Sequence, residues 1–357
     1  MSERKRVTLK DLAVEIDVHY STVSRVMNPA TRHLVARDVV ARVLEVAHAW
    51  GFRPNRIAAG LRTQRSGLVG VVLPDLANPV FPPILAGIEA MLAQHGYVPI
   101  VINAGTDKSR QRFVIDQIVA RQVEGLLLAT AERDDPLLDY CLAQHVPVVL
   151  VNRGEDTGRA SCVVNDNLLA MRMTVDHLVA LGHRRIGHIA GPEVLSTGHL
   201  RREGFEHAVR RHRLRRDAWR VVEAASYSRQ AGHEACARLF EALPGLTAIA
   251  AGNDLVAMGC YDYLRATGIR CPEDVSVAGH NDMPFVDALV PPLTTIRMAM
   301  RDMGEQATAL LLRQIESPHG KAVTAKLVPK LVVRGSTAQP THLASPRHGK
   351  TIQSVRT

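Results

Sequence analysis

Three short helical patterns of apolar residues open the chain. They predict helices over residues 9–15, 20–27 and 36–50, because apolar side chains recur there every three or four positions. The breaks between them contain Asp17 and the pair Asn28-Pro29, and Gly51 ends the third pattern. Two helices joined by a tight break and followed by a supporting helix form a helix-turn-helix arrangement, whose second helix enters the major groove of DNA.

Beyond residue 67, short apolar runs alternate with helical patterns. The apolar runs predict strands at residues 68–73, 98–102, 125–128, 146–151, 186–190, 221–223, 248–251 and 275–278. The helical patterns lie at residues 81–95, 110–121, 168–181, 200–211, 229–241 and 255–266. This alternation predicts parallel sheets covered by helices on both faces. Because about 270 residues exceed one such sheet, we expect two α/β subdomains with a cleft between them.

The net charge of +9 is distributed unevenly. Residues 1–66 hold 12 Lys and Arg against 6 Asp and Glu, and residues 336–357 hold 3 basic and no acidic residues. The region between them is therefore neutral overall. A small basic domain joined to a large neutral one is typical of a protein that binds an anionic polymer.

The composition also bears on the compartment and on cofactors. A hydrophobic content of 46% excludes a wholly disordered chain, and no run of 18 apolar residues predicts a transmembrane helix. The basic start leads into polar, helical sequence, unlike a signal peptide. Five scattered cysteines without a CxxC motif argue against a disulfide framework or a zinc site. We therefore expect a cytoplasmic protein with no metal and no membrane partner.

No catalytic or cofactor-binding motif occurs in the chain. GxGxxG, GxxxxGK[ST], GxSxG and HExxH are all absent, and His233-Glu234 is followed by Ala237 where a second zinc-binding histidine would fall. The sequence therefore predicts that the protein is not an enzyme and needs no cofactor.

Three motifs in the first 62 residues carry a family resemblance. They begin at Val7 (VTLKDLA), Ser21 (STVSRVMN) and Gly51 (GFRPNRIAAGLR). Their order and spacing resemble the lac repressor (LacI-type) family of bacterial transcription regulators. The resemblance continues through the loops that begin near Pro74 and Ala251, among others. It implies a small all-α helix-turn-helix headpiece (1–52), a hinge helix or linker (53–66), an effector-binding and dimerisation α/β core of two subdomains similar to periplasmic sugar-binding proteins (67–335), and a tail (336–357).

The resemblance implies roles for headpiece side chains. Bases are read by Tyr20, Ser21 and Arg25, and phosphates are held by Thr8, Thr22 and Asn28. The chemistry agrees, since Arg presents a bidentate fork to guanine and hydroxyls near helix N-termini suit phosphate. Two positions depart from the family: Asp17 replaces the usual Gly of the turn, and His19 replaces a capping Ser or Thr and becomes a further phosphate contact. The alternatives are a solvated surface role for Arg25 and a plain N-cap role for Thr8.

A second DNA element is implied for the hinge. Its candidate DNA-binding residues are Asn55, Arg56, Ala58 and Leu61. By family precedent, Leu61 is a wedge in the minor groove that kinks the central base step. Gly60 weakens this short helix, which suits an element that folds only on DNA. An ordinary linker is the alternative interpretation.

The resemblance also implies an effector site in the core. The matching positions are Phe81, Asn152, Arg153, Thr197, Arg201, Tyr227, Asn253 and Asn281. Several of them follow predicted strands, and open α/β sheets bind ligands at the carboxyl ends of their strands. Other roles remain open: Phe81 and Tyr227 as core residues, Asn253 as a helix cap, and the two arginines in structural ion pairs.

Two of these positions bear on the charge of the effector. Asn152 and Asn281 stand where family members that bind neutral sugars usually have Asp. Losing two carboxylates while keeping Arg153 and Arg201 favours an anionic ligand. Among small molecules of the sugar class, we therefore expect a sugar acid, a phosphorylated sugar or a small carboxylate.

The expected function is that of a sequence-specific regulator, most often a repressor, which binds double-stranded operator DNA as a homodimer and is controlled by a small-molecule effector. The tail contains Pro340, Pro346 and only one leucine, so it lacks the heptads of a tetramerising coiled coil and is predicted to be disordered and basic. A solute-binding protein of transport is an alternative, although it would carry a signal peptide and no basic headpiece. A regulator controlled by a protein partner is another.

Overall fold

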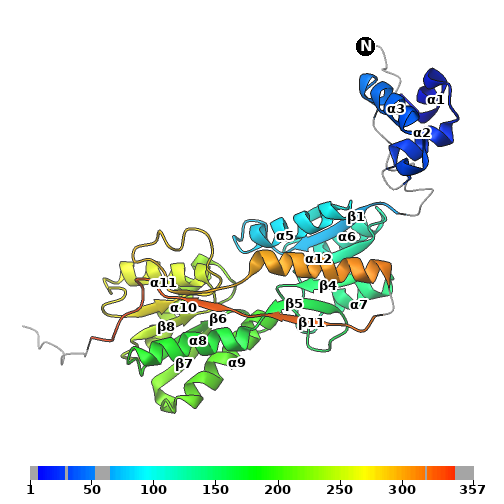
Figure 1. The fold of residues 1–357 in the computed structure, drawn as a ribbon. Coiled ribbons are helices and arrows are strands. Elements are labelled where there is room, and N and C mark those ends of the chain that lie inside the picture. Colours follow the sequence, from blue (N-terminus) through cyan, green and yellow to red (C-terminus); the bar gives the residue numbers. More distant parts are fainter. Residues whose placement is uncertain (1–6, 29–30, 53–64, 318–319, 342–357) are drawn as a thin grey trace, which may run out of the picture. The chain divides into compact units, whose positions relative to one another are not determined.

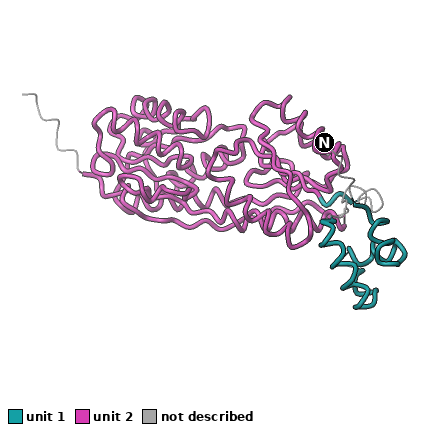
Figure 2. Tube along the Cα trace, turned by 90° about the horizontal axis from the view of Figure 1, so that it is seen from above, with its two compact units in different colours: residues 1–67 teal, residues 68–357 magenta. Residues whose placement is uncertain are grey.

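The structure is a computed structural model, and it describes residues 7–28, 31–52, 65–317 and 320–341 (Figure 1). The chain divides into two compact units, residues 1–67 and residues 68–357 (Figure 2). Most of the predicted hinge, including Asn55, Arg56, Ala58 and Leu61, lies outside the described residues.

The first unit is a three-helix structure. Its helices are α1 (Leu9–Ile16), α2 (Tyr20–Met27) and α3 (Arg37–Ala49), and a short 3-10 turn (Arg32–Leu34) that the pattern did not predict links the last two. The helices pack through a small apolar core made of Leu12, Ala13, Ile16, Val23, Val26, Val43 and Ala47. These positions are the apolar stripes that predicted the helices.

Two local features hold the turn between α1 and α2. Thr8 and Asp11 form a reciprocal capping box at the start of α1, where the Asp11 amide donates to the Thr8 hydroxyl over 3.2 Å. Asp17 ends this helix in the left-handed conformation, with φ 55° and ψ 54°. Asp tolerates this region better than most residues, so the turn forms without the usual Gly.

The second unit contains two parallel sheets. The six-stranded sheet has the order β11-β5-β4-β3-β1-β2, with strands β1 (Leu68–Leu73), β2 (Val98–Asn103), β3 (Gly125–Leu128), β4 (Val148–Val151), β5 (Ser161–Asn165) and β11 (Thr324–Leu327). The four-stranded sheet has the order β7-β6-β8-β9, with strands β6 (Ile186–Ala190), β7 (Trp219–Glu223), β8 (Ala248–Ala251) and β9 (Ser276–Ala278). A short antiparallel pair joins β10 (Thr295–Arg297) and β12 (Lys330–Val332).

Helices cover both faces of each sheet (Figure 1). The six-stranded sheet packs against α5 (Phe81–Gln94) and α12 (Met300–Glu316) on one face and against α6 (Lys108–Val119) and α7 (Pro136–Ala143) on the other. These elements form the first half of the core. The four-stranded sheet packs against α10 (Arg229–Ala242) and α11 (Asp254–Ala266) on one face and α8 (Asn167–Ala180) and α9 (Ser196–Arg211) on the other. These elements form the second half, so the predicted fold class is confirmed.

Four strands and two helices of the core were missing from the predicted pattern. Strands β5, β10, β11 and β12 are three to five residues long, and polar residues such as Lys326 and Lys330 interrupt their apolar runs. The helix α7 has only eight residues. The helix α12 was missed although Met300, Met303, Ala307 and Leu311 recur in it at helical spacing.

The prediction that a disordered tail begins at residue 336 is wrong. Ser336 is fully buried and forms two hydrogen bonds with Val277 of β9. The Val277 amide donates to Ser336 O over 2.9 Å, and the Ser336 hydroxyl donates to Val277 O over 2.6 Å. The Ala338 amide donates to the Ser276 hydroxyl over 3.1 Å. Residues 336–341 therefore belong to the core, because they supply hydrogen-bond partners for the edge strand β9. The rest of the tail lies outside the described residues.

Candidate DNA-binding surface and ligand cavity

The outer face of α2 displays the predicted DNA-contacting side chains. Tyr20 is 51% exposed, Arg25 is exposed, and Ser21 and Thr22 are half-buried, whereas Val23 and Val26 point into the core. Thr8 and Asn28 are exposed at the start of α1 and the end of α2. No hydrogen bond or ion pair involves the Arg25 side chain in the described part of the chain, so its guanidinium group is available for an external acceptor.

Side chains from outside α2 fix the position of its two ends. His19 is its N-cap, because the Nδ1 atom accepts a hydrogen bond from the Ser21 amide over 3.3 Å. At the other end, the Thr31 hydroxyl donates to Arg25 O over 3.0 Å and Arg32 Nε donates to Val26 O over 2.8 Å. Sequence reasoning missed both C-terminal contacts, since neither fits a standard capping pattern.

The eight candidate effector residues surround one cavity in the second unit. Its lining consists of Asn78, Val80, Phe81, Asn152, Arg153, Thr197, Arg201, Tyr227, Asn253 and Asn281. The volume of this cavity is about 20 Å³, which is room for about one water molecule. A sugar-sized ligand therefore requires the side chains or the two halves to move apart.

The topology explains why residues so distant in sequence meet here. Phe81 follows β1 and Asn152 follows β4 of the first half, whereas Tyr227 follows β7 and Asn253 follows β8 of the second half. The carboxyl ends of both parallel sheets therefore face the same cavity, as expected for ligand sites in open α/β sheets. Asn78 and Val80, which the sequence reasoning missed, belong to the loop after β1.

Arg201 is held in the cavity by neutral oxygens alone. The side chain is 3% exposed, Nε donates to Asn167 Oδ1 over 2.8 Å and Nη1 donates to Gly252 O over 2.7 Å. The guanidinium carbon lies 5.7 Å from the centre of the Tyr227 ring, within the range of a cation–π contact. Within the described residues no ion pair involves Arg201, so the alternative of a structural ion pair is not observed there.

Tyr227 lies directly against the backbone of Gly191. A Cβ atom at residue 191 would overlap the Tyr227 ring, so any larger residue there would displace the ring. The Tyr227 hydroxyl donates to the Thr197 hydroxyl over 3.3 Å. Gly191 therefore positions one wall of the cavity, and a Gly at the end of strand β6 was the signal available in the sequence.

Arg153 has an unsatisfied donor. Its Nε atom is buried and has no hydrogen-bond partner, and no ion pair involves its side chain within the described ranges. Burial lowers the pKa of Arg153 and of Arg201 from the usual arginine value, since each charge has lost much of its hydration. An anion in the cavity would give both guanidinium groups a hydrogen-bond acceptor of opposite charge.

Asn253 has both of the roles that the sequence left open. Its side-chain oxygen accepts a hydrogen bond from the Val256 amide over 2.8 Å, which makes it the N-cap of α11, and it also lines the cavity. Its neighbour Asp254 is fully buried, accepts hydrogen bonds from the Thr295 hydroxyl (2.6 Å) and the Met283 amide (2.8 Å), and does not line the cavity. Burial raises the pKa of Asp254 to about 6, so this group loses its negative charge in mildly acidic solution.

Three contacts join the two halves at the edge of the cavity. Arg133 Nη1 forms an ion pair with Glu193 over 3.4 Å, the Arg133 amide donates to Val194 O over 3.0 Å, and the Gly154 amide donates to the Ser196 hydroxyl over 2.9 Å. The first partner in each pair belongs to the first half and the second partner to the second half. These contacts hold the halves in a closed arrangement.

His188 gives the second half a measurable pH response. It is fully buried in β6 against the ring of Phe205, and burial lowers its pKa to about 4. Because the unfolded chain binds the proton more readily, this residue destabilises the fold as the pH falls from about 6.5 to about 4. We expect the free energy of unfolding of the wild type, relative to His188→Gln, to drop by roughly 3 kcal/mol over that range in urea titrations. A constant difference would contradict the buried, neutral imidazole.

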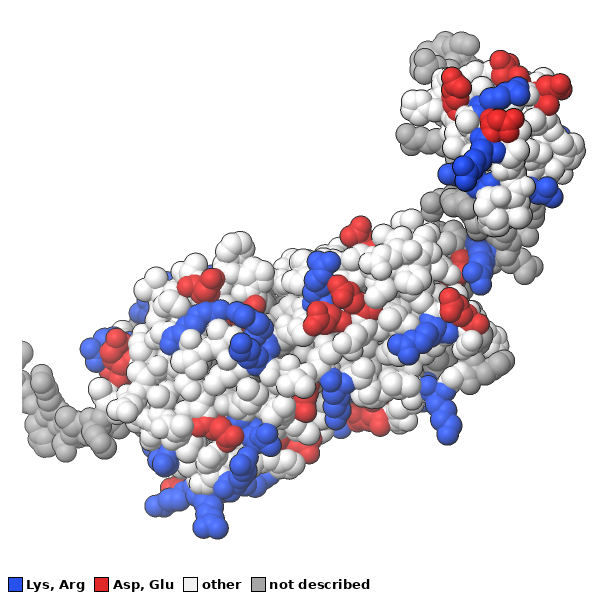
Figure 3. All heavy atoms as spheres, in the orientation of Figure 1, with Lys and Arg blue, Asp and Glu red and all other residues white. Residues whose placement is uncertain are grey.

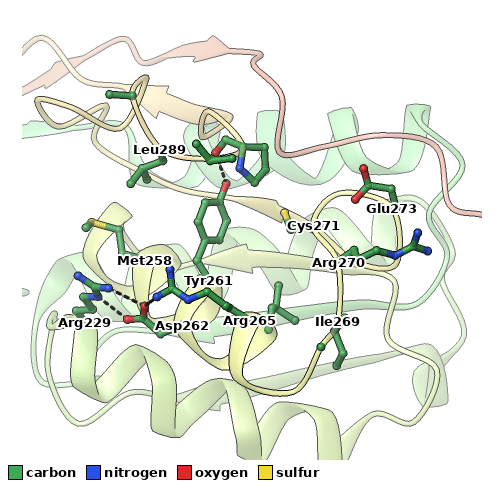
Figure 4. Close-up of a pocket in the computed structure, with 15 residues that line it drawn as sticks. Arg229, Met258, Tyr261, Asp262, Arg265, Ile269, Arg270, Cys271, Glu273 and Leu289 are labelled. Carbon is green, nitrogen blue, oxygen red and sulfur yellow. Dashed lines mark hydrogen bonds and ion pairs between the residues drawn. The ribbon is translucent and has the colours of Figure 1, made fainter.

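A larger hollow lies away from this cavity, at the end of α11 (Figure 4). Its volume is about 690 Å³, and Arg229, Tyr261, Asp262, Cys271 and Val290 are among its lining residues. Arg229 Nη2 donates to Asp262 Oδ1 over 2.6 Å, and the Tyr261 hydroxyl donates to Pro291 O over 3.1 Å. Because these polar groups already bond partners within the chain and Leu289 and Val290 line the hollow beside them, it resembles a packing surface more than a small-molecule site.

Comparisons with known proteins agree with this architecture. The family of periplasmic binding protein-like domains matches residues 175–337. An HTH-type transcriptional regulator of Streptomyces limosus is 34% identical over 93% of this chain and 94% of its own length. The HTH-type transcriptional repressor CytR of Escherichia coli is 30% identical over 92% of this chain and 96% of its own. The structure of the lac repressor dimer bound to operator and the anti-inducer ONPF covers 94% of this chain and 100% of its own, with a TM-score of 0.83 and 27% identity.

A helix-turn-helix unit followed by a periplasmic-binding-protein-like core defines the class of DNA-binding transcription regulators with a ligand-binding type of core. Within this class, the chain belongs to the lac repressor (LacI-type) family. The family resemblance drawn from the sequence motifs is thus confirmed. In the described residues, no helix is long and apolar enough to cross a membrane.

Proposed function

We propose that this protein is a repressor that binds a near-palindromic operator as a homodimer and releases or tightens its hold when a small anionic molecule enters the core cavity. The exposed face of α2 supports the DNA-binding part, with Arg25 and Ser21 as base-reading residues and Thr8, His19, Thr22 and Asn28 as phosphate contacts. The cytoplasm, where the operator lies, is the corresponding compartment.

The charge of the cavity carries the proposal about the effector. Arg153 and Arg201 both line it, and neither has a carboxylate partner among the described residues. Asn152 and Asn281 add neutral amides. Asn152 and Asn281 adopt positive φ angles of 67° and 120°, and they lie in the loops that follow β4 and β9. A carboxylate or phosphate group on a sugar-sized ligand would accept hydrogen bonds from both guanidinium groups.

Effector binding is coupled to operator binding if the ligand has a higher affinity for one arrangement of the two halves of the core. The contacts from Arg133 and Gly154 close the cavity edge, and the enclosed space is too small for a sugar. A ligand must therefore bind an arrangement with a different separation of the halves, and differential affinity of this kind shifts the equilibrium. The lac repressor and the regulator CelR were solved with ONPF and with cellobiose, which supports a ligand of similar size in this chain.

A thermal-shift screen tests the effector class. Sugar acids, sugar phosphates and small carboxylates are compared with neutral sugars, and each stabilising compound is then tested for its effect on operator binding. We expect stabilisation by an anionic compound that also changes operator affinity. Stabilisation by a neutral sugar alone, lost in Arg201→Ala, would retain the site and overturn the anionic effector.

Exposed apolar residues support the homodimer. Val290 lines the hollow at the end of α11 and is 93% exposed, and Phe285, five positions before it in the chain, is 81% exposed. Large exposed apolar side chains often mark interaction sites, and a second copy of this chain is the partner we infer. The solved lac repressor that matches this chain is itself a dimer.

Placing a charge on this surface should separate the subunits. We expect Val290→Asp to raise the dimer dissociation constant at least tenfold in analytical ultracentrifugation, because the carboxylate would be buried without a partner. Operator affinity should fall with it, since each half-site then binds one headpiece. The matched control is Val328→Asp, which alters a valine that is 76% exposed on another surface. An unchanged dimer in Val290→Asp would show that the interface lies elsewhere.

A further inference from the structure

A second groove lies outside the effector cavity, where α8, α9 and β11 meet. Its volume is about 640 Å³. It is lined by Asp166, Leu168, Leu169, Arg172, Gly204, His207, Ala208, Arg211 and Lys326. The groove shares no lining residue with the effector cavity. Its volume is in the range of sites that bind small molecules.

The groove has a surplus of positive charge. Arg172, Arg211 and Lys326 are exposed cations, and His207 adds a fourth basic side chain. The one lining carboxylate, Asp166, already accepts a hydrogen bond from the Leu169 amide over 2.9 Å as the N-cap of α8. Figure 3 shows basic side chains gathered along the lower edge of the core, in the region of α9.

These cations lack close partners within the chain. Arg172 and Lys326 form no ion pair and no side-chain hydrogen bond with any described residue. Arg211 lies 3.9 Å from Asp176 Oδ2, and the other oxygen of Asp176 is bound to His212 Nε2 over 2.6 Å. Several other exposed arginines of the described chain are paired with a carboxylate, as Arg270 is with Asp274 over 2.7 Å. The groove therefore concentrates unneutralised charge that an external anion would stabilise.

The floor of the groove is kept free of side chains by the packing of the two helices. A Cβ atom at Gly204 on α9 would lie 3.1 Å from Leu168 Cα and 3.0 Å from Met171 Cβ on α8. The two helices are therefore in close contact there, and the small residues Gly204 and Ala208 line the groove beside this contact.

The basic residues come from both halves of the core. Lys326 lies on β11, an edge strand of the six-stranded sheet, whereas Arg172 and Arg211 lie on helices that cover the four-stranded sheet. An anion held by all three would bridge the two halves from outside the effector cavity.

We propose that this groove is a second anion site, which binds a phosphate-bearing small molecule and links the two halves of the core. Guanidinium groups bind phosphate oxygens through paired hydrogen bonds, and the Lys326 ammonium supplies a third positive charge. The site goes beyond the proposed function, because it requires neither Arg153 nor Arg201.

Calorimetric titration with inorganic pyrophosphate at constant ionic strength tests the site. We expect a binding event in the full-length protein that persists when the effector cavity is altered. Because exposed charge pairs contribute modestly, Arg172→Gln and Lys326→Gln should each weaken it about threefold to fivefold, and the double variant about tenfold or more. Arg172 and Lys326 are both exposed, so the variants should unfold at the wild-type temperature.

Two sets of variants separate this groove from other sources of binding. Lys321→Gln/Lys330→Gln removes the same charge from exposed, unpaired positions outside the groove, and it should leave the affinity unchanged. Arg153→Gln and Arg201→Gln alter the effector cavity, so pyrophosphate bound in that cavity should be lost, whereas the binding event in the groove should remain. An equal loss in the Lys321/Lys330 control, or a loss in the cavity variants with retention in Arg172→Gln/Lys326→Gln, would overturn the groove site without bearing on operator binding.

Discussion

Arg201→Ala should bind operator DNA as the wild type does and fail to respond to the effector. The headpiece is a separate unit and stays intact, whereas the cavity loses a guanidinium group that only neutral oxygens hold in place. Effector coupling of ~1–3 kcal/mol corresponds to a change of about 5–150-fold in operator affinity. We expect this change to vanish in the variant when anisotropy titrations are run with and without the effector.

Two further variants make this expectation specific. Arg201→Lys keeps the charge but removes the planar fork, so it should restore only part of the response. Arg202→Ala changes the next residue of α9, which pairs with Glu206 and does not line the cavity, and it should respond normally. A full response in Arg201→Ala, with unfolding at the wild-type temperature, would exclude Arg201 from effector binding.

Arg25→Ala should weaken specific binding to the operator by roughly 1–3 kcal/mol, or about 5–150-fold. The side chain is exposed on α2 and has no partner in the described chain, so its loss should not disturb the core of the headpiece. Base preference within each half-site should relax. Competition titrations with operators altered at single positions would measure both effects.

Random DNA is the comparison that decides the role of Arg25. A residue that reads bases affects operator binding far more than non-specific binding, whereas a phosphate contact affects both equally. Arg37→Ala, an exposed arginine at the start of α3, serves as the matched control and should cost much less specificity. Equal losses on operator and random DNA would assign Arg25 to the phosphates.

Local sequence was enough to predict most of the helix-turn-helix unit. Its helices, the capping box at Thr8 and the left-handed turn at Asp17 depend on residues three or four positions apart, where side-chain chemistry decides the outcome. The short edge strands β10, β11 and β12 could not be found in this way, since they become strands only by pairing with distant segments.

The sequence by itself determined the family, the alternation of most strands and helices, and eight of the ten positions that line the cavity. Only the tertiary structure decided which basic side chains have a carboxylate partner. Arg201 donates to residues 34 and 51 positions away, and Lys326 meets α8 and α9 only because β11 pairs with β5. Whether a basic side chain is neutralised depends on which distant carboxylates fold beside it, because electrostatic attraction acts through space and not along the chain.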